Sequence, residues 1–304
     1  MRVPRFGSVI CAMVTPFGSD GGLDLDGAAR LARWLVANGN DGLVVAATTG
    51  EGATLSDAEK LDLWRAVREA VDVPVIAGTG TASTAHTVEL TKAAADIGAD
   101  AALVVTPYYN RPSQAGIEAH FRAAAEATRL PVIAYDIPKR TGREIAPATL
   151  ARLAGDRVIA ALKDASGSPA ATGALIARAP ADFEVYSGDD ALTLALLAAG
   201  AVGVISVASH WAGKAFSEMV AVWQKGDASA AAEVNRRLVE SFEFEATETA
   251  PNPVPTKAML RALGLPAGEC RLPMGPTPPG LEQRAEQVLA NLGHWLPGAP
   301  GKAV

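Results

Sequence analysis

Short apolar runs alternate with helix-like segments along the first 225 residues of this 304-residue chain. The runs are continuous rather than alternating, which is typical of strands buried on both faces of a parallel sheet. Eight strands are expected, at Val9–Val14, Gly42–Ala46, Val75–Ala77, Ala101–Val105, Val132–Tyr135, Val158–Leu162, Phe183–Tyr186 and Gly203–Val207. Eight helices are expected, at Leu25–Ala37, Ser56–Val71, Ser83–Ile97, Gln114–Thr128, Pro147–Leu153, Ala170–Ala179, Asp190–Ala199 and Ala212–Trp223.

Eight strand–helix units in succession favour a closed barrel. Each parallel strand needs a covering helix, and eight strands is the number that closes into a (β/α)8 or TIM barrel. An open doubly wound sheet is the alternative. That sheet usually has a glycine-rich phosphate turn after its first strand, and here the first strand is followed by Thr15-Pro16-Phe17. We therefore predict an α/β protein with a (β/α)8 barrel over residues 1–225.

The strand pattern stops at about Lys225, and a helical C-terminal region is expected over residues 226–296. Its helices are expected at Asp227–Ala246, Thr256–Leu263 and Pro279–Leu292. Residues 297–304 are predicted to form a flexible tail.

Composition excludes several classes of function. The 27 Lys and Arg residues are outnumbered by 33 Asp and Glu, and no basic cluster is present to bind nucleic acid. No apolar run approaches the ~20 residues that span a bilayer. Cys11 and Cys270 make neither a disulfide framework nor a zinc pattern, and the four histidines lack metal-ligand spacing. We therefore expect a cytoplasmic protein with reduced thiols and no metal.

Lys163 is the most informative single residue. In a barrel of this class, functional groups lie at the carboxyl ends of the strands and in the loops that follow. Lys163 alone among the lysines caps an apolar run, that of Val158–Leu162. Burial there disfavours the ammonium form and lowers the pKa, which frees the amine as a nucleophile toward carbonyl groups. The alternative is a lysine ion-paired with Asp164 or another carboxylate.

Other strand ends carry groups that suit a small carboxylate substrate. Thr48 and Thr49 lie in a turn whose backbone N–H groups and hydroxyls can hold a carboxylate. Tyr109 and Tyr135 offer phenols that can donate and accept a proton, and Arg140 offers a guanidinium for two-point contact. Each group alone also fits a structural role, as an ordinary turn, a core-to-solvent tyrosine or a surface arginine. Because all fall on the same predicted barrel face, we interpret that face as the active site.

Taken together, these residues resemble the family of pyruvate-dependent class I lyases typified by dihydrodipicolinate synthase and N-acetylneuraminate lyase. The resemblance covers about Gly7 to Pro273 and depends on motifs that are specific in combination. They are Ala-Met-Val-Thr-Pro-Phe at 12–17, Thr-Thr-Gly-Glu at 48–51, Thr-Pro-Tyr-Tyr-Asn at 106–110, Tyr-x-x-Pro-x-Arg-Thr-Gly at 135–142, Lys163, Ser-Gly-Asp-Asp at 187–190, Gly-Val-Ile-Ser at 203–206, Asn-Pro-x-Pro at 252–255 and Arg-Leu-Pro at 271–273.

The resemblance implies a Schiff-base mechanism that needs no cofactor. Lys163 would form an imine with pyruvate, and Thr49 with its neighbouring amides would bind the pyruvate carboxylate. Tyr135, hydrogen-bonded to Thr48, would relay protons. In the family a tyrosine of a neighbouring subunit completes this relay, and Tyr109 is the matching position. The resemblance therefore also implies a homo-oligomer, a tetramer built as a dimer of dimers.

The resemblance implies that Gly188 and Ile205 contribute backbone carbonyls near the lysine.

The resemblance also bears on the second substrate. Arg140, followed by Thr141-Gly142, favours the dihydrodipicolinate synthase branch, in which pyruvate condenses with aspartate 4-semialdehyde in lysine biosynthesis by the diaminopimelate route. The alternatives are another pyruvate-dependent aldolase or lyase, acting on a 2-keto-3-deoxy sugar acid or N-acetylneuraminate, and a non-catalytic binding relative.

Some family members are inhibited by lysine, and this chain departs from their pattern. Those members carry a serine, two histidines, an asparagine and a glutamate at the positions that hold Gly52, Asp57, Lys60, Ala82 and His86 here. We therefore expect weak or no inhibition by lysine.

Overall fold

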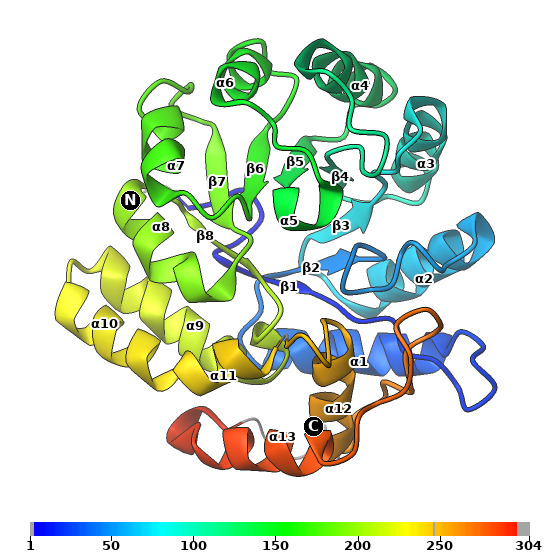
Figure 1. Ribbon diagram of the computed structural model, residues 1–304, viewed down its shortest axis with the longest axis vertical. Coiled ribbons are helices and arrows are strands. Elements are labelled where there is room, and N and C mark those ends of the chain that lie inside the picture. The colour runs from blue at the N-terminus through cyan, green and yellow to red at the C-terminus, as the bar shows by residue number, and fades with distance from the viewer. Residues whose placement is uncertain (1–2, 246, 297–304) are drawn as a thin grey trace.

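Eight parallel strands close into a barrel in the computed structural model, which describes residues 3–245 and 247–296. Each strand pairs with the strand before it in the chain, and the last pairs with the first (Figure 1). This confirms the predicted α/β barrel. The strands are β1 (Val9–Ala12), β2 (Gly42–Val45), β3 (Val75–Gly78), β4 (Ala101–Val105), β5 (Val132–Asp136), β6 (Ala161–Asp164), β7 (Glu184–Ser187) and β8 (Gly203–Ser206).

Most strand residues are apolar, and almost all are buried because both faces of the sheet are covered. Side chains that point inward pack against one another, and those that point outward pack under the surrounding helices. Branched aliphatic residues predominate inside the barrel, where they fill the space between strands. The interior cluster includes Ile10, Val44, Ile76, Leu103, Ile133, Tyr135, Tyr186 and Ile205.

The sixth strand differs from its prediction. The apolar run predicted a strand over Val158–Leu162, but β6 covers Ala161–Asp164, so that Lys163 lies within the strand rather than beyond it. The ladder continues because Lys163 and Asp164 are in register with residues of both neighbouring strands. A hydrophobicity pattern cannot detect this, since polar side chains at the barrel mouth do not interrupt backbone pairing.

The helices confirm most of the predicted pattern, with their ends shifted by a few residues. Those associated with the barrel are α1 (Leu25–Ala37), α2 (Asp57–Ala70), α3 (Thr84–Asp96), α4 (Gln114–Glu126), α5 (Pro138–Thr141), α6 (Pro147–Gly155), α7 (Pro169–Ile176), α8 (Thr193–Ala199) and α9 (Ser209–Gln224), and a 3-10 turn, η1 (Asp190–Leu192), precedes α8. The short α5 is absent from the prediction because four residues cannot show helical periodicity.

Local capping explains where these helices begin. Ser56 caps α2 in a capping box, in which its side chain accepts from the Glu59 N–H and the Glu59 carboxylate accepts from the Ser56 N–H. Asp24 and Ser83 likewise accept from the first turns of α1 and α3. These side chains satisfy N–H groups that have no partner within the helix.

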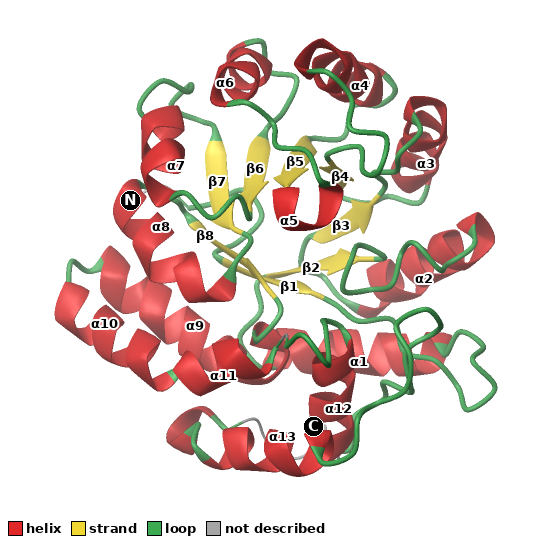
Figure 2. Cartoon of the chain, viewed as in Figure 1, coloured by secondary structure: helices red, strands yellow, loops and turns green. Residues whose placement is uncertain are grey.

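After the barrel, the described chain consists of helices and loops (Figure 2). The helices are α10 (Ala228–Arg237), α11 (Val239–Phe244), α12 (Val254–Ala262) and α13 (Leu281–Ala290), followed by a 3-10 turn, η2 (Gly293–Trp295). Figure 1 shows α12 and α13 on the side of the barrel where α1 and α9 lie. This region packs on the barrel through α9, which contacts both α10 and α12.

The single helix predicted over Asp227–Ala246 is wrong. The chain turns at the buried Leu238, which ends α10 and begins α11. The physical reason is that the two halves pack on different partners, α10 on α9 and α11 on α13 and η1. The predicted boundary at residue 225 falls in the turn between α9 and α10. Whether the segments on either side of it are separate folding units stays a prediction.

Two other expectations concern the ends of the chain and membranes. The tail predicted over 297–304 lies outside the described residues. Within residues 3–245 and 247–296, no helix is both long enough and apolar enough to cross a membrane.

Candidate active site

A cavity of about 430 Å³ lies at the carboxyl ends of the barrel strands. Its walls come from the segments after β2, β3, β4 and β5 and from the segment that leads into α12. Thr48, Tyr135, Arg140 and Asn252 are among the residues that line it. The cavity therefore occupies the end of the barrel at which sequence analysis placed the active site.

Lys163 and Tyr135 lie side by side next to this cavity. They are partners in the register between β6 and β5, and the Nζ of Lys163 is 4.4 Å from the centroid of the Tyr135 ring. Both side chains are 4% exposed. Tyr135 lines the cavity and Lys163 does not, so the amine lies just inside the wall.

Strand geometry keeps the neighbouring carboxylates away from this amine. Asp136 and Asp164 are also register partners, and because successive side chains of a strand point to opposite faces, they point away from the barrel interior. The Asp164 carboxylate accepts hydrogen bonds from the Ser166 N–H and the Thr172 hydroxyl. Lys163 and Asp164 therefore do not form an ion pair with each other.

Burial lowers the pKa of Lys163 to about 8. The Asp190 carboxylate opposes this shift, and the Arg140 guanidinium adds to it. A usable fraction of the amine is thus neutral near pH 7, as nucleophilic attack on a carbonyl requires.

Tyr135 is poised as a proton donor. Burial raises the pKa of Tyr135 to about 12, although Arg140 and a hydrogen bond with the Thr48 side chain oppose the shift. The phenol therefore keeps its proton at neutral pH and can both donate and accept a hydrogen bond. The structure brings together Lys163, Tyr135 and Thr48 from three different strand ends.

The turn after β2 forms a small concave surface of backbone N–H groups. The amides of Thr48, Thr49 and Gly50 donate to no other group within the part of the chain that the structure describes. Ala46 and Glu51, at either end of the turn, have left-handed backbone with φ of +57° and +53°. Successive free N–H groups in such a turn suit an anion, which agrees with the predicted carboxylate site.

Asn252 is a site residue whose contacts sequence analysis missed. Its side-chain Nδ2 donates to the Thr49 hydroxyl at 3.0 Å, and its backbone carbonyl accepts from Arg140 Nη2 at 3.3 Å. Arg140 lies on α5 and lines the cavity. The Asn-Pro-x-Pro motif at 252–255 contributed to the family resemblance, but it did not predict which groups the asparagine contacts.

The remaining predicted residues lie apart from the cavity wall. Ile205 is fully buried in β8, and Gly188 packs on the lysine stem. A Cβ at Gly188 would lie 2.9 Å from Lys163 Cγ, so a glycine is needed there. Tyr109 is 94% exposed with φ of +70°, and this chain alone does not bring it to Lys163.

A buried carboxyl pair near the lysine was also missed. The Asp190 Oδ2 accepts from the backbone N–H groups of Val207 and Ala208, and the Glu245 carboxyl is hydrogen-bonded to Asp190. Burial and the Asp190 charge raise the pKa of Glu245 well above its usual range. No sequence pattern connects these two residues, because they meet only through the packing of α11 on η1.

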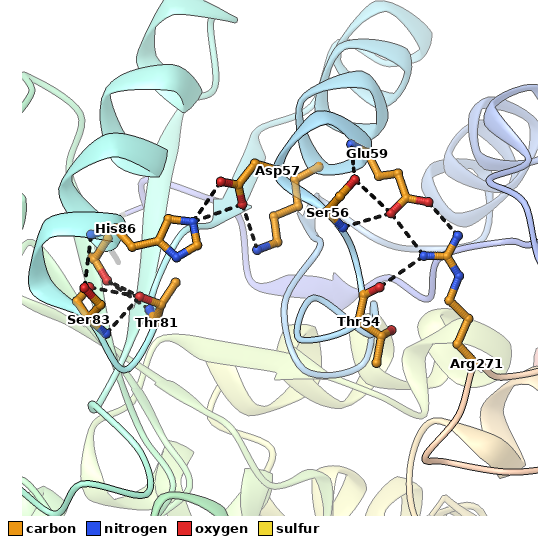
Figure 3. A network of polar contacts seen from close by, with 10 residues as sticks. Thr54, Ser56, Asp57, Glu59, Thr81, Ser83, His86 and Arg271 are labelled. Carbon is orange, nitrogen blue, oxygen red and sulfur yellow. Dashed lines mark hydrogen bonds and ion pairs between the residues drawn. The ribbon is translucent and has the colours of Figure 1, made fainter.

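The positions matched to a lysine-binding site form a different polar network here. Asp57 of α2 points toward His86 of α3, with a His86 Nε2 to Asp57 Oδ2 distance of 2.9 Å (Figure 3). Lys60 Nζ is 3.7 Å from Asp57 Oδ1. All three residues line the cavity, so its outer wall carries polar side chains that already contact one another.

No metal site accompanies this cavity in the described residues. Within them, no group of three or more His, Cys, Asp or Glu side chains is arranged to hold an ion. Cys11 and Cys270 are both free thiols.

Comparisons with known proteins agree with this geometry. The chain matches the model of the Dihydrodipicolinate synthetase family over residues 5–292. It is 52% identical over 272 residues to the 4-hydroxy-tetrahydrodipicolinate synthase of Moorella thermoacetica, a match that covers 89% of this chain and 92% of that relative.

Solved structures agree as well. The crystal structure of dihydrodipicolinate synthase from Cyanidioschyzon merolae with lysine bound gives a TM-score of 0.91 at 43% identity, covering 95% of this chain and 98% of that one. A monomeric dihydrodipicolinate synthase variant gives a TM-score of 0.90 at 38% identity, covering 94% and 96%. The chain therefore belongs to the dihydrodipicolinate synthetase family.

Proposed function

We propose that this protein is a lyase that condenses pyruvate with aspartate 4-semialdehyde to form 4-hydroxy-tetrahydrodipicolinate, the reaction of relatives such as the Moorella thermoacetica enzyme. The observation that carries the proposal is the buried Lys163 amine 4.4 Å from the Tyr135 ring centroid. The reaction belongs to lysine and diaminopimelate biosynthesis. It needs no cofactor, because the imine itself withdraws electrons from the substrate.

The first half of the reaction uses pyruvate alone. The Lys163 amine attacks the keto carbon, and water leaves as the imine forms. The free amides of the turn and the Thr49 hydroxyl hold the pyruvate carboxylate. Tyr135, hydrogen-bonded to Thr48, supplies and accepts the protons. Backbone carbonyls of Gly188 and Ile205 line the path of the lysine side chain.

The second half uses the enamine that remains after a methyl proton leaves. Its carbon attacks the aldehyde of aspartate 4-semialdehyde, and the new carbon–carbon bond forms. The amino group of that substrate then displaces the Lys163 amine as the ring closes. Arg140, at the cavity wall, binds the carboxylate of the semialdehyde. This guanidinium favours a short acidic aldehyde over the polyhydroxyl chain of a sugar acid.

Two broader features belong to the proposal. Tyr109 is 94% exposed in a strained backbone conformation, which supports a place in the active site of a neighbouring subunit. We therefore infer a homo-oligomer, built as a dimer of dimers. The substrates are small metabolites, and the proposed location is the cytoplasm.

The first prediction concerns imine formation and its pH dependence. Pyruvate and borohydride should add to Lys163 alone, as peptide mass mapping will show. The neutral amine reacts, so the trapping rate should rise about tenfold per pH unit below a pKa of about 8 and level off above it. An unmodified Lys163 in an enzyme that turns over contradicts the proposal.

The second prediction concerns Arg140→Ala. Loss of a charge-assisted contact should lower kcat/KM for aspartate 4-semialdehyde by about 10- to 100-fold. Imine trapping with pyruvate should persist, with its pH profile moved to higher pH because the guanidinium lowers the pKa of Lys163. Lys139→Ala, one residue away, is the control. Activity on 2-keto-3-deoxygluconate or N-acetylneuraminate alone would select the sugar-acid alternative.

The third prediction concerns the exposed tyrosine. Tyr109→Phe should lower kcat by about 100-fold through loss of a proton-relay group, while the oligomer measured by sedimentation is unchanged. Dilution of the wild-type protein to monomers should lower activity in parallel. A fully active monomer contradicts a shared site.

The fourth prediction concerns lysine. Because Asp57, Lys60 and His86 are already paired with one another, free lysine should inhibit weakly or not at all at millimolar concentration. A steady-state titration at fixed pyruvate measures this. Strong saturable inhibition contradicts the expectation.

A further inference from the structure

Three motif residues with no part in the proposed chemistry, Phe17, Glu51 and Arg271, meet Lys257 beneath the turn after β2. The Nζ of Lys257, on α12, lies 2.6 Å from Glu51 Oε1, and both side chains are 1% exposed. Arg271 donates its backbone N–H to Glu51 Oε2 at 2.8 Å. Lys257 and Arg271 also both lie over the Phe17 ring, at 4.1 and 4.2 Å from its centroid. Segments far apart in the sequence thus converge on one carboxylate.

This cluster is a costly way to gain stability. Two charges lose their hydration when they are buried, and an apolar pair of similar volume is often as stable or more stable. Burial lowers the pKa of Lys257, and the Glu51 carboxylate opposes that shift. Stability alone therefore does not account for an ion pair at this position.

Glu51 ends the turn that holds the free amides. Its φ of +53° is in the left-handed region, as is the φ of +57° at Ala46. A Cβ at Gly52 would lie 2.1 Å from the Ala46 carbonyl oxygen, so the two ends of the turn are in close contact. Non-glycine residues keep such a conformation only where their surroundings hold them there. The Glu51 side chain provides that hold, since both its oxygens are tied to the C-terminal region.

A second link joins the same helix to the same turn. Thr256, next to Lys257 on α12, donates its hydroxyl to Asn252 Oδ1 at 3.1 Å, and Asn252 donates to the Thr49 hydroxyl at 3.0 Å. Arg271 is itself held by an ion pair, with its Nη2 at 2.5 Å from Glu59 Oε1 (Figure 3). The turn is therefore held at its centre and at its end by the C-terminal region.

We propose that Lys257 and Glu51 are positioning residues for pyruvate: their buried ion pair holds the turn that presents the Thr48 and Thr49 amides to the substrate carboxylate. Both side chains are 1% exposed and act through the turn rather than on the substrate itself. The inference rests on the proposed function of this turn as the pyruvate carboxylate site. It makes the helical C-terminal region part of the active-site machinery.

The test compares two substitutions on α12. Lys257→Met keeps the side-chain bulk beside Phe17 and removes the charge. Displacement of the turn should raise the pyruvate concentration that half-saturates borohydride trapping of Lys163 by about 10- to 100-fold. KM for pyruvate should rise in parallel, and KM for aspartate 4-semialdehyde should stay within about twofold of wild type, because the Arg140 contact is retained.

Arg261→Met is the matched control. Arg261 lies one turn further along α12 and pairs with Glu282 at 2.6 Å, without contact to the turn after β2. It should lower the melting temperature and leave pyruvate half-saturation unchanged. Lys257→Arg, which keeps the cation, should return half-saturation toward the wild-type value. If Lys257→Met does not fold, Glu51→Gln serves as the test variant, since it also removes the ion pair.

The outcomes separate the two proposals. Wild-type trapping with unchanged half-saturation in Lys257→Met overturns the positioning role and leaves the proposed function intact. An equal rise in Arg261→Met, in proportion to lost stability, also overturns it, because the effect is then only structural. Absence of trapping at Lys163 in the wild type overturns the proposed function itself.

Discussion

The burial of one amine inside a closed barrel is the constraint on which the site depends. A closed sheet has no edges, so its interior excludes water except at the mouth, and a lysine there loses the hydration that stabilises its charge. The register between β5 and β6 sets Tyr135 against Lys163 and turns Asp136 and Asp164 outward. A shift of one residue could set Lys163 opposite Asp136, and the carboxylate would then stabilise the ammonium form and raise the pKa of the amine.

The barrel alone does not complete the site. The turn proposed to bind the pyruvate carboxylate follows β2, and Arg140 follows β5. Asn252 bridges them, with its side chain on Thr49 and its carbonyl on Arg140. A segment from the C-terminal region therefore sets the distance between the proposed sites for pyruvate and for the second substrate. The geometry of both proposed substrate sites therefore depends on the C-terminal region being folded in place.

The sequence was sufficient to predict the architecture and to place Lys163, Tyr135 and Thr48 near one another. Strand burial on two faces and helical periodicity are local signals, so the barrel and the helix over Leu25–Ala37 could be predicted closely. These three residues were predicted to lie together because strand ends in a barrel converge on one face, and their chemical roles stay predictions. The break between α10 and α11 at Leu238 and the contact of Glu245 with Asp190 depend on which elements pack together. No local sequence pattern encodes that packing.

Motif residues that carry no chemistry are still informative about it. Thr49 and Glu51 belong to the same short motif, but the Thr49 hydroxyl accepts from Asn252 while the Glu51 carboxylate pairs with Lys257. The Glu51 carboxylate is 1% exposed, and a buried charge costs free energy unless it is paired. The folded protein therefore needs its partner, Lys257. The motif residues Phe17 and Arg271 and the buried Lys257 then have a common explanation. Under the proposed function, they hold the strained turn whose amides would bind the pyruvate carboxylate.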